Sequence, residues 1–463
     1  MSAVAQPGPA GHRDLIDALA AYAAGVRLQH MPEGARRQAR LCILDTIGAI
    51  VAGSRTDDYR PLLEVESREH PAPEAAVVGA GRRLSVQAAA RVNAYMGDIF
   101  ELNDLIGGHA SIGNVSALVA LAESLGAGGA RLVEAVAIGI EVTARVYAGY
   151  YPAIKPFTEV GMNPVGFPAS LGVAAGAAHL LGLSREQAAH AIGIGAALAG
   201  WCPSEVIFGD GGSVKPMLFG ACPATAGLAG ARYAQAGMTG PHLLLEGSRG
   251  YFNTAARRSF PEAVLDRDIW YLQQPRRKLH ACCGYIHGPI DTVVQMRRAG
   301  VPVADAAAIR IGMTALTIPA VSKPGPPVSA TDARFHLQYC VALAALGEDV
   351  IAPEHSMDFA AHMTRPEIAS LVPRIRVVDD PALTHYHQCT VALLDATGAV
   401  VEKRTGTVPK GAPGNPMSDD EVRAKFRRLA AARMPADDID AYIGRIERLE
   451  SDDDLRWVAG SFG

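Results

Sequence analysis

The sequence predicts a mainly α protein in which a large all-α helical domain carries an inserted, smaller α+β domain. Up to residue 272, segment after segment repeats apolar side chains at three- and four-residue spacing, which is typical of packed helices. Strand-like patterns begin only after residue 300, and helical patterns return after the Pro- and Gly-rich segment 408–416. We therefore expect residues 1–272 and 409–463 to form the helical domain and residues 273–408 to form the insert.

The composition is that of a chain that buries most of its length. It has 463 residues, of which 49% are hydrophobic and 19% are charged, and its formal net charge is −4. The length exceeds that of one ordinary core, and the charge provides no general attraction for nucleic acid. We expect a small-molecule ligand held by a few specific cations, and no nucleic-acid partner.

The helical segments are rich in Ala and Gly, which allows helices to approach one another closely. Segment 160–184 has no Asp, Glu, Lys or Arg, but alanine is too weakly apolar to favour lipid, so we expect a tightly packed helix and no membrane span. Ser184 followed by Gln187 predicts a capping box at the start of another helix.

The sequence pattern changes after residue 300. The alternation of apolar and polar residues that is typical of strands is not found before that point. We expect strands at 307–321 and 374–380, a helix at 332–347, a hairpin at 387–406 that turns at 396–398, and C-terminal helices within 418–434 and 436–449. Acidic residues crowd the first turns of these last helices, as the helix dipole favours.

Cysteine usage indicates reduced thiols. The count is odd, the chain is long and no CxxC pair occurs, which is typical of a cytoplasm-like compartment. The N-terminal segment 1–15 has no basic start followed by an apolar run, so we expect no secretory signal and a cytoplasmic location. The seven cysteines are Cys42, Cys202, Cys222, Cys282, Cys283, Cys340 and Cys389.

One short segment, KLHACCGYIH from Lys278 to His287, holds a lysine, two histidines, a tyrosine and two adjacent cysteines. If it is helical, Cys283 and His287 lie on one face with His280 one turn earlier, and zinc accepts such ligands. Adjacent cysteines usually point apart, however, and no second Cys/His cluster completes four ligands. We expect no metal ion here; an acid/base site and buried, inert cysteines stay open.

A second segment, DIFELNDLIGGHAS from Asp98 to Ser111, places three acids, an amide and a histidine where a loop is expected. Glu101, Asp104 and His109 are candidates for an acid/base cluster, in which a carboxylate holds one tautomer of the imidazole. The alternative is ordinary capping and turn chemistry by Asn103 and Asp104.

A third segment, GDGGSVKPMLFG, places Lys215 after three glycines. It fails as a phosphate-binding loop because Pro216 follows the lysine, and the glycines of 193–200 fail as a dinucleotide fingerprint because no strand precedes them. A lysine in such a loop can still bind a carboxylate, although a plain surface loop is an equal alternative.

Together these segments resemble the MmgE/PrpD family, whose members include 2-methylcitrate dehydratase, cis-aconitate decarboxylase and iminodisuccinate epimerase. The similarity is carried in order by LCILDTIGAIVAG, NAYMGDIFELNDLIGGHAS, VKPMLFG with AGMTGP and LEGSRGYF, KLHACCGYIHGPID and ARFHLQYCVALAAL. The resemblance implies a homodimer whose subunits have a helical domain, a smaller α+β lid domain and an active site between them, without metal or organic cofactor. It implies catalytic roles for His109, Lys215, Lys278 and Tyr339, and substrate contacts from Glu101, Asp104, His280, Cys283 and His287.

The chain also departs from the family's pattern. Where the family has DFDDT, a His after G-F, an Arg after the Cys of the lid motif and a Tyr at its third position, this chain has Glu101, Asn103, Leu105, Pro168 after Phe167, Gly284 and His280. The site thus loses at least one cation and gains an imidazole. A smaller or less charged substrate than a tricarboxylate is expected.

The function that this resemblance implies is a cofactor-independent lyase that abstracts a proton next to a carboxylate or similar group of a small organic acid. Lysines would stabilise the charge that develops on the acid, and a histidine would take or give the proton. Elimination of water is the leading outcome, with epimerisation and decarboxylation as alternatives. A family-like protein that binds a ligand without turnover is a further alternative.

Overall fold

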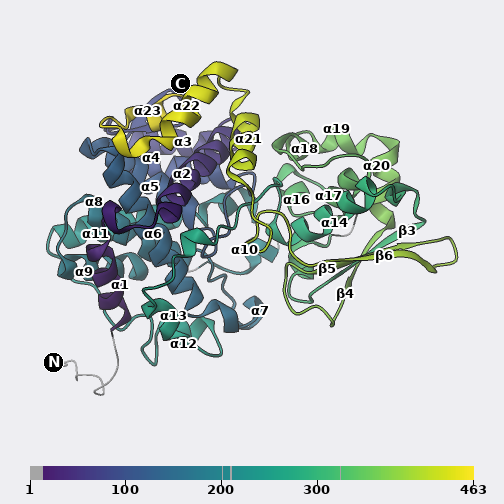
Figure 1. Ribbon diagram of the computed structural model, residues 1–463, viewed down its shortest axis with the longest axis horizontal. Helices are drawn as coiled ribbons and strands as arrows, with labels where there is room; N and C mark the ends of the chain where they lie inside the picture. The colour runs from purple at the N-terminus through teal and green to yellow at the C-terminus, as the bar shows by residue number, and fades with distance from the viewer. Residues whose placement is uncertain (1–13, 201, 209–210, 324) are drawn as a thin grey trace.

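The computed structural model describes residues 14–200, 202–208, 211–323 and 325–463. The expectation about an N-terminal signal concerns residues that lie mostly outside these ranges. The mainly α fold class is confirmed (Figure 1).

Helices make up the first part of the described chain. They are α1 (Leu15–Gly25), α2 (Glu33–Gly53), α3 (Arg60–Glu69), α4 (Val86–Asp98), α5 (Ala110–Leu125), α6 (Gly129–Ala148), α7 (Phe157–Val160), α8 (Phe167–Leu180), α9 (Arg185–Ala197), α10 (Glu205–Phe208), α11 (Ala221–Gln235), α12 (Tyr251–Ala255) and α13 (Pro261–Leu265). The capping box at Ser184 and Gln187 is present at the start of α9.

Small residues let these helices pack closely, as the composition predicted. A Cβ added at Gly172 on α8 would lie 2.0 Å from Thr143 Oγ1 and 2.2 Å from the carbonyl oxygen of Gly139, both on α6. The interior of segment 160–184 is therefore a packed helix, α8, and no helix among the described residues is long and apolar enough to cross a membrane.

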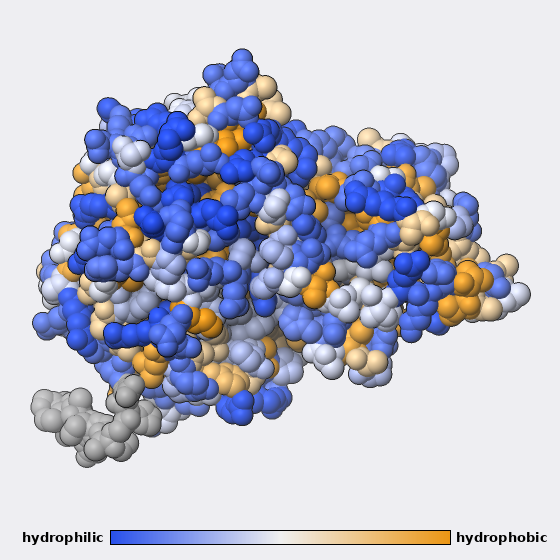
Figure 2. Space-filling view, viewed as in Figure 1, coloured by the Kyte–Doolittle hydropathy of each residue, from blue (hydrophilic) through white to orange (hydrophobic). Residues whose placement is uncertain are grey.

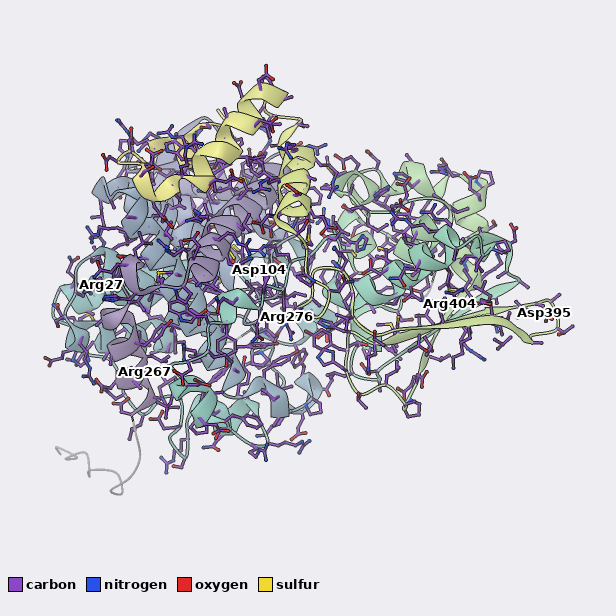
Figure 3. All side chains as sticks on the ribbon, in the orientation of Figure 1. Arg27, Asp104, Arg267, Arg276, Asp395 and Arg404 are labelled. Atoms are coloured by element: carbon purple, nitrogen blue, oxygen red, sulfur yellow. The ribbon has the colours of Figure 1, made fainter. Side chains whose placement is uncertain are left out.

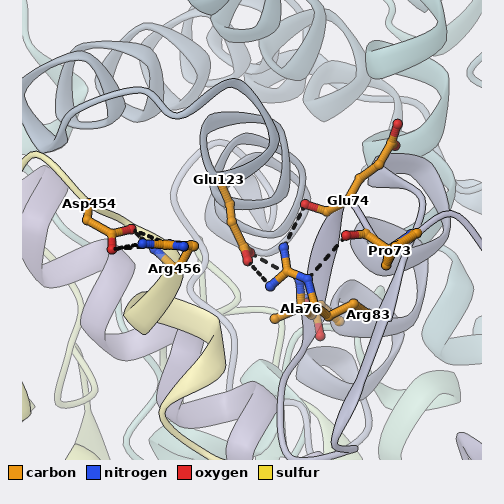
Figure 4. Close-up of polar contacts among 8 residues, drawn as sticks. Pro73, Glu74, Ala76, Arg83, Glu123, Asp454 and Arg456 are labelled. Carbon is orange, nitrogen blue, oxygen red and sulfur yellow. Dashed lines mark hydrogen bonds and ion pairs between the residues drawn. The ribbon is translucent and has the colours of Figure 1, made fainter.

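A short β-ribbon before residue 300 was not expected from the sequence. Strands β1 (Ala75–Val77) and β2 (Arg82–Leu84) pair antiparallel, and three residues each are too few to show alternation. Arg83 binds this ribbon to α5, because its guanidinium donates to the Glu123 carboxylate and, at 2.9 Å, to the carbonyl oxygen of Glu74 (Figure 4).

The second part of the chain contains a mixed sheet with helices. Its strands are β3 (Ala308–Met313), β4 (Ile375–Asp379), β5 (Cys389–Leu394) and β6 (Val400–Gly406), in the order β4-β3-β5-β6, with β3 and β4 parallel and the other pairs antiparallel. Its helices are α14 (His287–Arg298), α15 (Ile318–Val321), α16 (Ala330–Arg334), α17 (Leu337–Ala345), α18 (Pro353–Met357), α19 (Phe359–Met363) and α20 (Pro366–Leu371).

The expected strands and hairpin of this region are present, with two differences. Only the first half of 307–321 is a strand, since α15 follows it. The helix expected at 332–347 is divided into α16 and α17, because His336 adopts an extended conformation and its side chain accepts a hydrogen bond from the Tyr339 N–H.

The C-terminal part returns to helices α21 (Asp419–Ala430), α22 (Ala436–Glu447) and α23 (Arg456–Gly460). Figure 1 shows them, in yellow, over the larger helical body, where α21 packs on α2.

Most of the buried apolar residues fall into two clusters. One includes residues from Leu15 to Ala281 and from Met417 to Phe462, and the other includes residues from Cys282 to Leu393. We call the parts of the chain around these clusters the helical unit and the smaller unit. The chain first passes from one cluster to the other inside KLHACCGYIH, between Ala281 and Cys282.

The surface seen in Figure 2 is mainly hydrophilic over both units. Hydrophobic side chains gather at the far end of the smaller unit, where β6 carries the exposed Val400 and Val401.

Candidate active site

Glu101 stands at the centre of a buried cluster of charges. Its carboxylate forms ion pairs with Lys215 through Oε1 and with Lys278 through Oε2, the latter at 2.7 Å. All three side chains are nearly inaccessible to solvent. Burial alone would raise the pKa of Glu101, but the two ammonium groups hold it well below its usual range. The two lysines expected to hold the substrate anion are therefore already paired with a carboxylate of the protein.

His109 is held by an unusual backbone. Gly107, Gly108 and His109 have φ values of 50°, 70° and 77°, all in the left-handed region. A Cβ at Gly107 would lie 2.7 Å from the Cα of Ala144 on α6, so glycine is required there by space as well as by conformation. The turn leaves the imidazole at the N-terminus of α5, stacked on Phe219 with ring centroids 4.2 Å apart.

The residue that orients His109 is Asn103, not a carboxylate as the sequence suggested. His109 Nδ1 lies 2.7 Å from Asn103 Oδ1, and Asn103 Nδ2 donates to the Asp98 carboxylate. Because the amide gives its N–H to Asp98, its oxygen faces the imidazole, and Nδ1 must be the donor. In the neutral ring, Nε2 then carries the lone pair that can take a proton.

Electrostatics keep this histidine neutral. Burial lowers the pKa of His109 well below its usual value, and Lys278 adds to the effect. Asp98 is completely buried, and burial followed by the nearby charge of Glu101 raises its pKa to about 7. The carboxyl at the end of this hydrogen-bond chain therefore titrates near neutral pH.

Asp104 binds the first turn of α5, and its role as a substrate contact stays a prediction. Its carboxylate accepts hydrogen bonds from the hydroxyl and, at 3.3 Å, from the N–H of Ser111 in the first turn of α5. Burial raises the pKa of Asp104 to about 6. It is not part of the lining of the pocket beside His109.

A pocket of about 70 Å³ lies beside His109, between the helical unit and the smaller unit. Four of the expected site residues line it: Glu101, His109, Lys278 and Cys283. Lys215 is connected to it through Glu101, and its ammonium lies 3.8 Å from the centre of the Phe335 ring in the pocket wall. Burial raises the pKa of Cys283 to about 11, so its sulfur is a neutral thiol at pH 7.

Three expected site residues lie elsewhere. Tyr339 is buried inside the smaller unit, where its hydroxyl donates to the carbonyl oxygen of His355 at 2.7 Å. His280 has both ring nitrogens bonded, to Asp291 Oδ1 at 3.0 Å and to the N–H of Ile351 at 3.2 Å. His287 begins α14, and its Nε2 lies 3.3 Å from the carbonyl oxygen of Cys282. Catalytic and substrate-contact roles for these residues stay predictions.

The structure adds pocket residues beyond the expected site residues, although one of them, Tyr285, is the tyrosine of KLHACCGYIH. Four tyrosines line the pocket, namely Tyr147, Tyr151, Tyr285 and Tyr386, and Asp98 and Asn103 support His109. Burial raises the pKa of all four tyrosines, so their hydroxyls remain protonated donors. The aromatic-rich runs YAGYY at 147–151 and HYH at 385–387 were the available signal.

Two departures from the family's pattern are neighbours in space. A Cβ at Gly284 would lie 3.1 Å from Leu105 Cδ1 and 3.7 Å from Lys278 Cε. Leu105 therefore occupies the space toward which a longer side chain at position 284 would project. The pocket wall is therefore apolar at these two positions.

KLHACCGYIH is not one helix, because a 3₁₀ turn at Gly284–Ile286 precedes α14, so Cys283 and His287 do not share a helical face. In the ranges that the structure describes, no group of three or more His, Cys, Asp or Glu side chains could hold a metal ion.

Fold and site together define a mainly α protein with a buried His–Lys–carboxylate pocket between two units. The MmgE/PrpD N-terminal domain matches residues 17–262, and the MmgE/PrpD C-terminal domain matches residues 280–449. The chain belongs to the MmgE/PrpD family.

Three similar proteins are named as cis-aconitate decarboxylases or as a protein like them. The chain is 25% identical to cis-aconitate decarboxylase of Mus musculus over 96% of this chain and 92% of that protein. It is 27% identical to the cis-aconitate decarboxylase-like protein oryM of Aspergillus oryzae, over 91% and 90% of the two chains. It is 24% identical to cis-aconitate decarboxylase of Aspergillus terreus, over 89% and 88%.

Proposed function

We propose that this protein is a lyase that acts on a small organic acid by moving a proton at the carbon next to a carboxylate. The observation that carries this proposal is the orientation of His109: Asn103 engages Nδ1, which leaves Nε2 as a base in a ring that lines the pocket. Family membership and the names of the relatives support the same class of chemistry.

In the proposed reaction, His109 Nε2 takes the proton from the carbon next to the carboxylate. The electron pair of that C–H bond moves toward the carboxylate, whose second negative charge Lys278 stabilises. The charged cluster suits this role, because two ammonium groups share the Glu101 carboxylate, and while Asp98 is protonated the cluster keeps one net positive charge. The protonated tyrosines there can donate to the oxyanion or to a leaving group.

Three outcomes are considered, of which the first two follow this proton removal. Loss of a hydroxyl from the neighbouring carbon gives dehydration, and return of the proton to the opposite face gives epimerisation. In decarboxylation no proton is removed first: the C–C bond to the carboxylate breaks, CO₂ leaves, and the carbon that keeps the electron pair takes up a proton from a protonated tyrosine of the pocket, which regains it from water. The neutral state of His109 favours proton removal, whereas the relatives' names favour decarboxylation. We put dehydration first and decarboxylation second.

The decisive experiment compares His109→Gln with the wild type. Small hydroxy acids and unsaturated acids are incubated in deuterated water, and C–H exchange, water loss and CO₂ release are followed by NMR. Loss of a general acid/base costs about 100- to 10,000-fold in rate. We expect the variant to stay folded, to bind ligand and to lose most turnover, while His30→Gln at an exposed site changes nothing.

Retention of more than about a tenth of the activity by His109→Gln would remove His109 as the acid/base. Ligand binding by the wild type without exchange or turnover of any acid would favour the binding-protein alternative. We also propose a homodimer, as the family resemblance implies, which light scattering would report as twice 48.5 kDa.

A further inference from the structure

A second, larger cavity adjoins the pocket beside His109. It has a volume of about 630 Å³ and shares Leu105, Tyr147, Tyr151 and Tyr386 with the smaller pocket, whose volume is about 70 Å³. By a measure of 10–15 Å³ per water, the smaller pocket has room for roughly five waters. Any acid of more than a few non-hydrogen atoms must therefore extend into the larger cavity, which we call the groove.

The groove has a largely apolar and aromatic wall. Besides the shared tyrosines it includes Ile154, Tyr271 and Leu316. Among the described residues that line it, Arg276 is the one cationic side chain apart from a histidine. Figure 3 shows Arg276 at the junction of the two units. Its carbonyl oxygen accepts a hydrogen bond of 2.8 Å from the Leu105 N–H, which fixes its backbone at the boundary between groove and pocket.

The charge of Arg276 is not neutralised by the protein. Its Nη1 donates to the Tyr386 hydroxyl at 3.1 Å, and within the described ranges it forms no ion pair. The lysines beside His109 are different, because both bind Glu101. A half-buried guanidinium without a carboxylate partner can bind an anionic group of a ligand. The aromatic side chains around it can contact a flat part of the same ligand.

We propose that the groove selects an organic acid with a flat, apolar body that ends in a second anionic group. The reacting carboxylate end lies in the small pocket beside His109, the body lies between the groove's tyrosines, and the far anion binds Arg276. This substrate class rests on the proposed function for its reacting end. It differs from a compact tricarboxylate, which has no apolar body to cover these walls.

Three probes separate the parts of this proposal. They are 3-(4-carboxyphenyl)propanoate, which has the body and the far carboxylate, 3-phenylpropanoate, which lacks the far carboxylate, and glutarate, which lacks the body. Calorimetric titration of the wild type should show the first bound at least about tenfold more tightly than either of the others, since paired charged hydrogen bonds are among the strong ones. Equal binding of all three, or tighter binding of glutarate, overturns the proposal.

Variants then assign the effect to Arg276. Arg276→Met should remove the preference for the far carboxylate while 3-phenylpropanoate binds within about twofold of its wild-type affinity, and Arg276→Lys should keep part of the preference. Arg267→Met, at an exposed position away from the junction (Figure 3), is the matched control. An equal loss for both aromatic probes in Arg276→Met would mean that the variant disturbs the groove, and would overturn the assigned role.

The two proposals fail separately. If the probes show no preference but small acids still exchange a proton in a His109-dependent way, only the substrate class is wrong. If the preference for 3-(4-carboxyphenyl)propanoate is present and no acid exchanges a proton, the groove is a binding site and the proposed lyase reaction is wrong.

Discussion

Asn103 decides which nitrogen of His109 can take a proton, and this makes a single amide a test of the mechanism. Asn103→Asp keeps an acceptor for Nδ1–H and puts a second carboxyl in contact with Asp98. Two carboxyls in contact share one proton, and with that proton on Asp98 the new carboxylate places its negative charge beside the ring. An anion stabilises the imidazolium, so the pKa of His109 should rise from its lowered position. His109 must be unprotonated to act as the base, so the rate falls as the pH drops through the pKa of His109. In the variant this fall, the acidic limb of the pH profile, should therefore occur at a higher pH.

The measurement is the pH profile of kcat/KM, which reports the ionisations of the free enzyme. Asn103→Leu is the control, because it removes the acceptor without adding charge and should lower the rate without moving the limb upward. An Asn103→Asp profile that coincides with the wild type would show that His109 does not control the acidic limb.

Glu101 gives the second prediction at the scale of single residues. Glu101→Gln leaves Lys215 and Lys278 buried at neutral pH without the carboxylate that binds them both. Breaking a buried ion pair by removing one partner costs about 3–5 kcal/mol. Urea unfolding should show a loss of that order, and adding Lys278→Met to the variant should recover part of it.

The direction in which this stability loss changes with pH follows from the lowered pKa of Glu101. Its contribution to stability is present above the unfolded-state pKa and is lost as pH falls through the folded one, so the variant and wild type should converge in acid. Glu402→Gln is the control, because the exposed pair with Arg404 contributes at most about 1 kcal/mol. A Glu101→Gln loss as small as that of the control would show that water reaches the lysines.

At the scale of elements, the turn before α5 joins the backbone of the site to α6. Gly107→Ala should lower stability strongly and displace His109, because its Cβ would meet the Ala144 backbone at 2.7 Å and 2.9 Å. Gly126→Ala, at the other end of α5, is the matched control. Its φ is 60°, but nothing lies within 4 Å of the added Cβ, so it carries only the conformational cost of about 1 kcal/mol.

Thermal unfolding and activity at low temperature are the two measurements for this pair. We expect Gly107→Ala to lose several-fold more stability than Gly126→Ala and most of its activity, while Gly126→Ala keeps near-normal activity. Similar losses in both variants would mean that the backbone at residue 107 relaxes and that the contact with α6 does not position His109.

The same scale shows why some elements follow from the sequence and others do not. β5 and β6 were predicted because each is long enough to show a strand pattern and a Gly-containing turn lies between them. β1 and β2 were missed because three residues show no period. The break between α16 and α17 depends on a local side-chain bond of His336, which helical periodicity does not reveal.

For the whole molecule, the site could be predicted only where the chain itself brings residues together. Glu101 and His109 were identifiable because one loop contains both. The partners of Lys278 and the tyrosine wall come from distant segments, so Tyr386 and Tyr147 were not found. Tyr339 was chosen on family resemblance, but in this structure its hydroxyl binds a backbone carbonyl inside the smaller unit.

The last prediction concerns how the two units are joined. Asp291 on α14 accepts from His280 Nε2 at 3.0 Å and from the Lys410 N–H at 2.6 Å. These donors lie on the two segments that connect the units, before Cys282 and before Met417. Asp291 therefore binds both connecting segments to α14 of the smaller unit.

Asp291→Ala leaves both donors without their acceptor. Loss of such a bond costs about 1–3 kcal/mol, so amide hydrogen exchange in 278–283 and 408–411 should become roughly tenfold faster or more, with α2 and α5 unchanged. Asp305→Ala, at an exposed position of the smaller unit, should leave every segment unchanged. Faster exchange everywhere would mean that Asp291 supports the global fold, and unchanged exchange at Lys410 would mean that the connecting segments are held by other contacts. Faster exchange confined to the two connecting segments would identify Asp291 as the residue that couples them. Because Lys278 lies on the first of these segments, Asp291 would then also help to hold Lys278 beside the pocket.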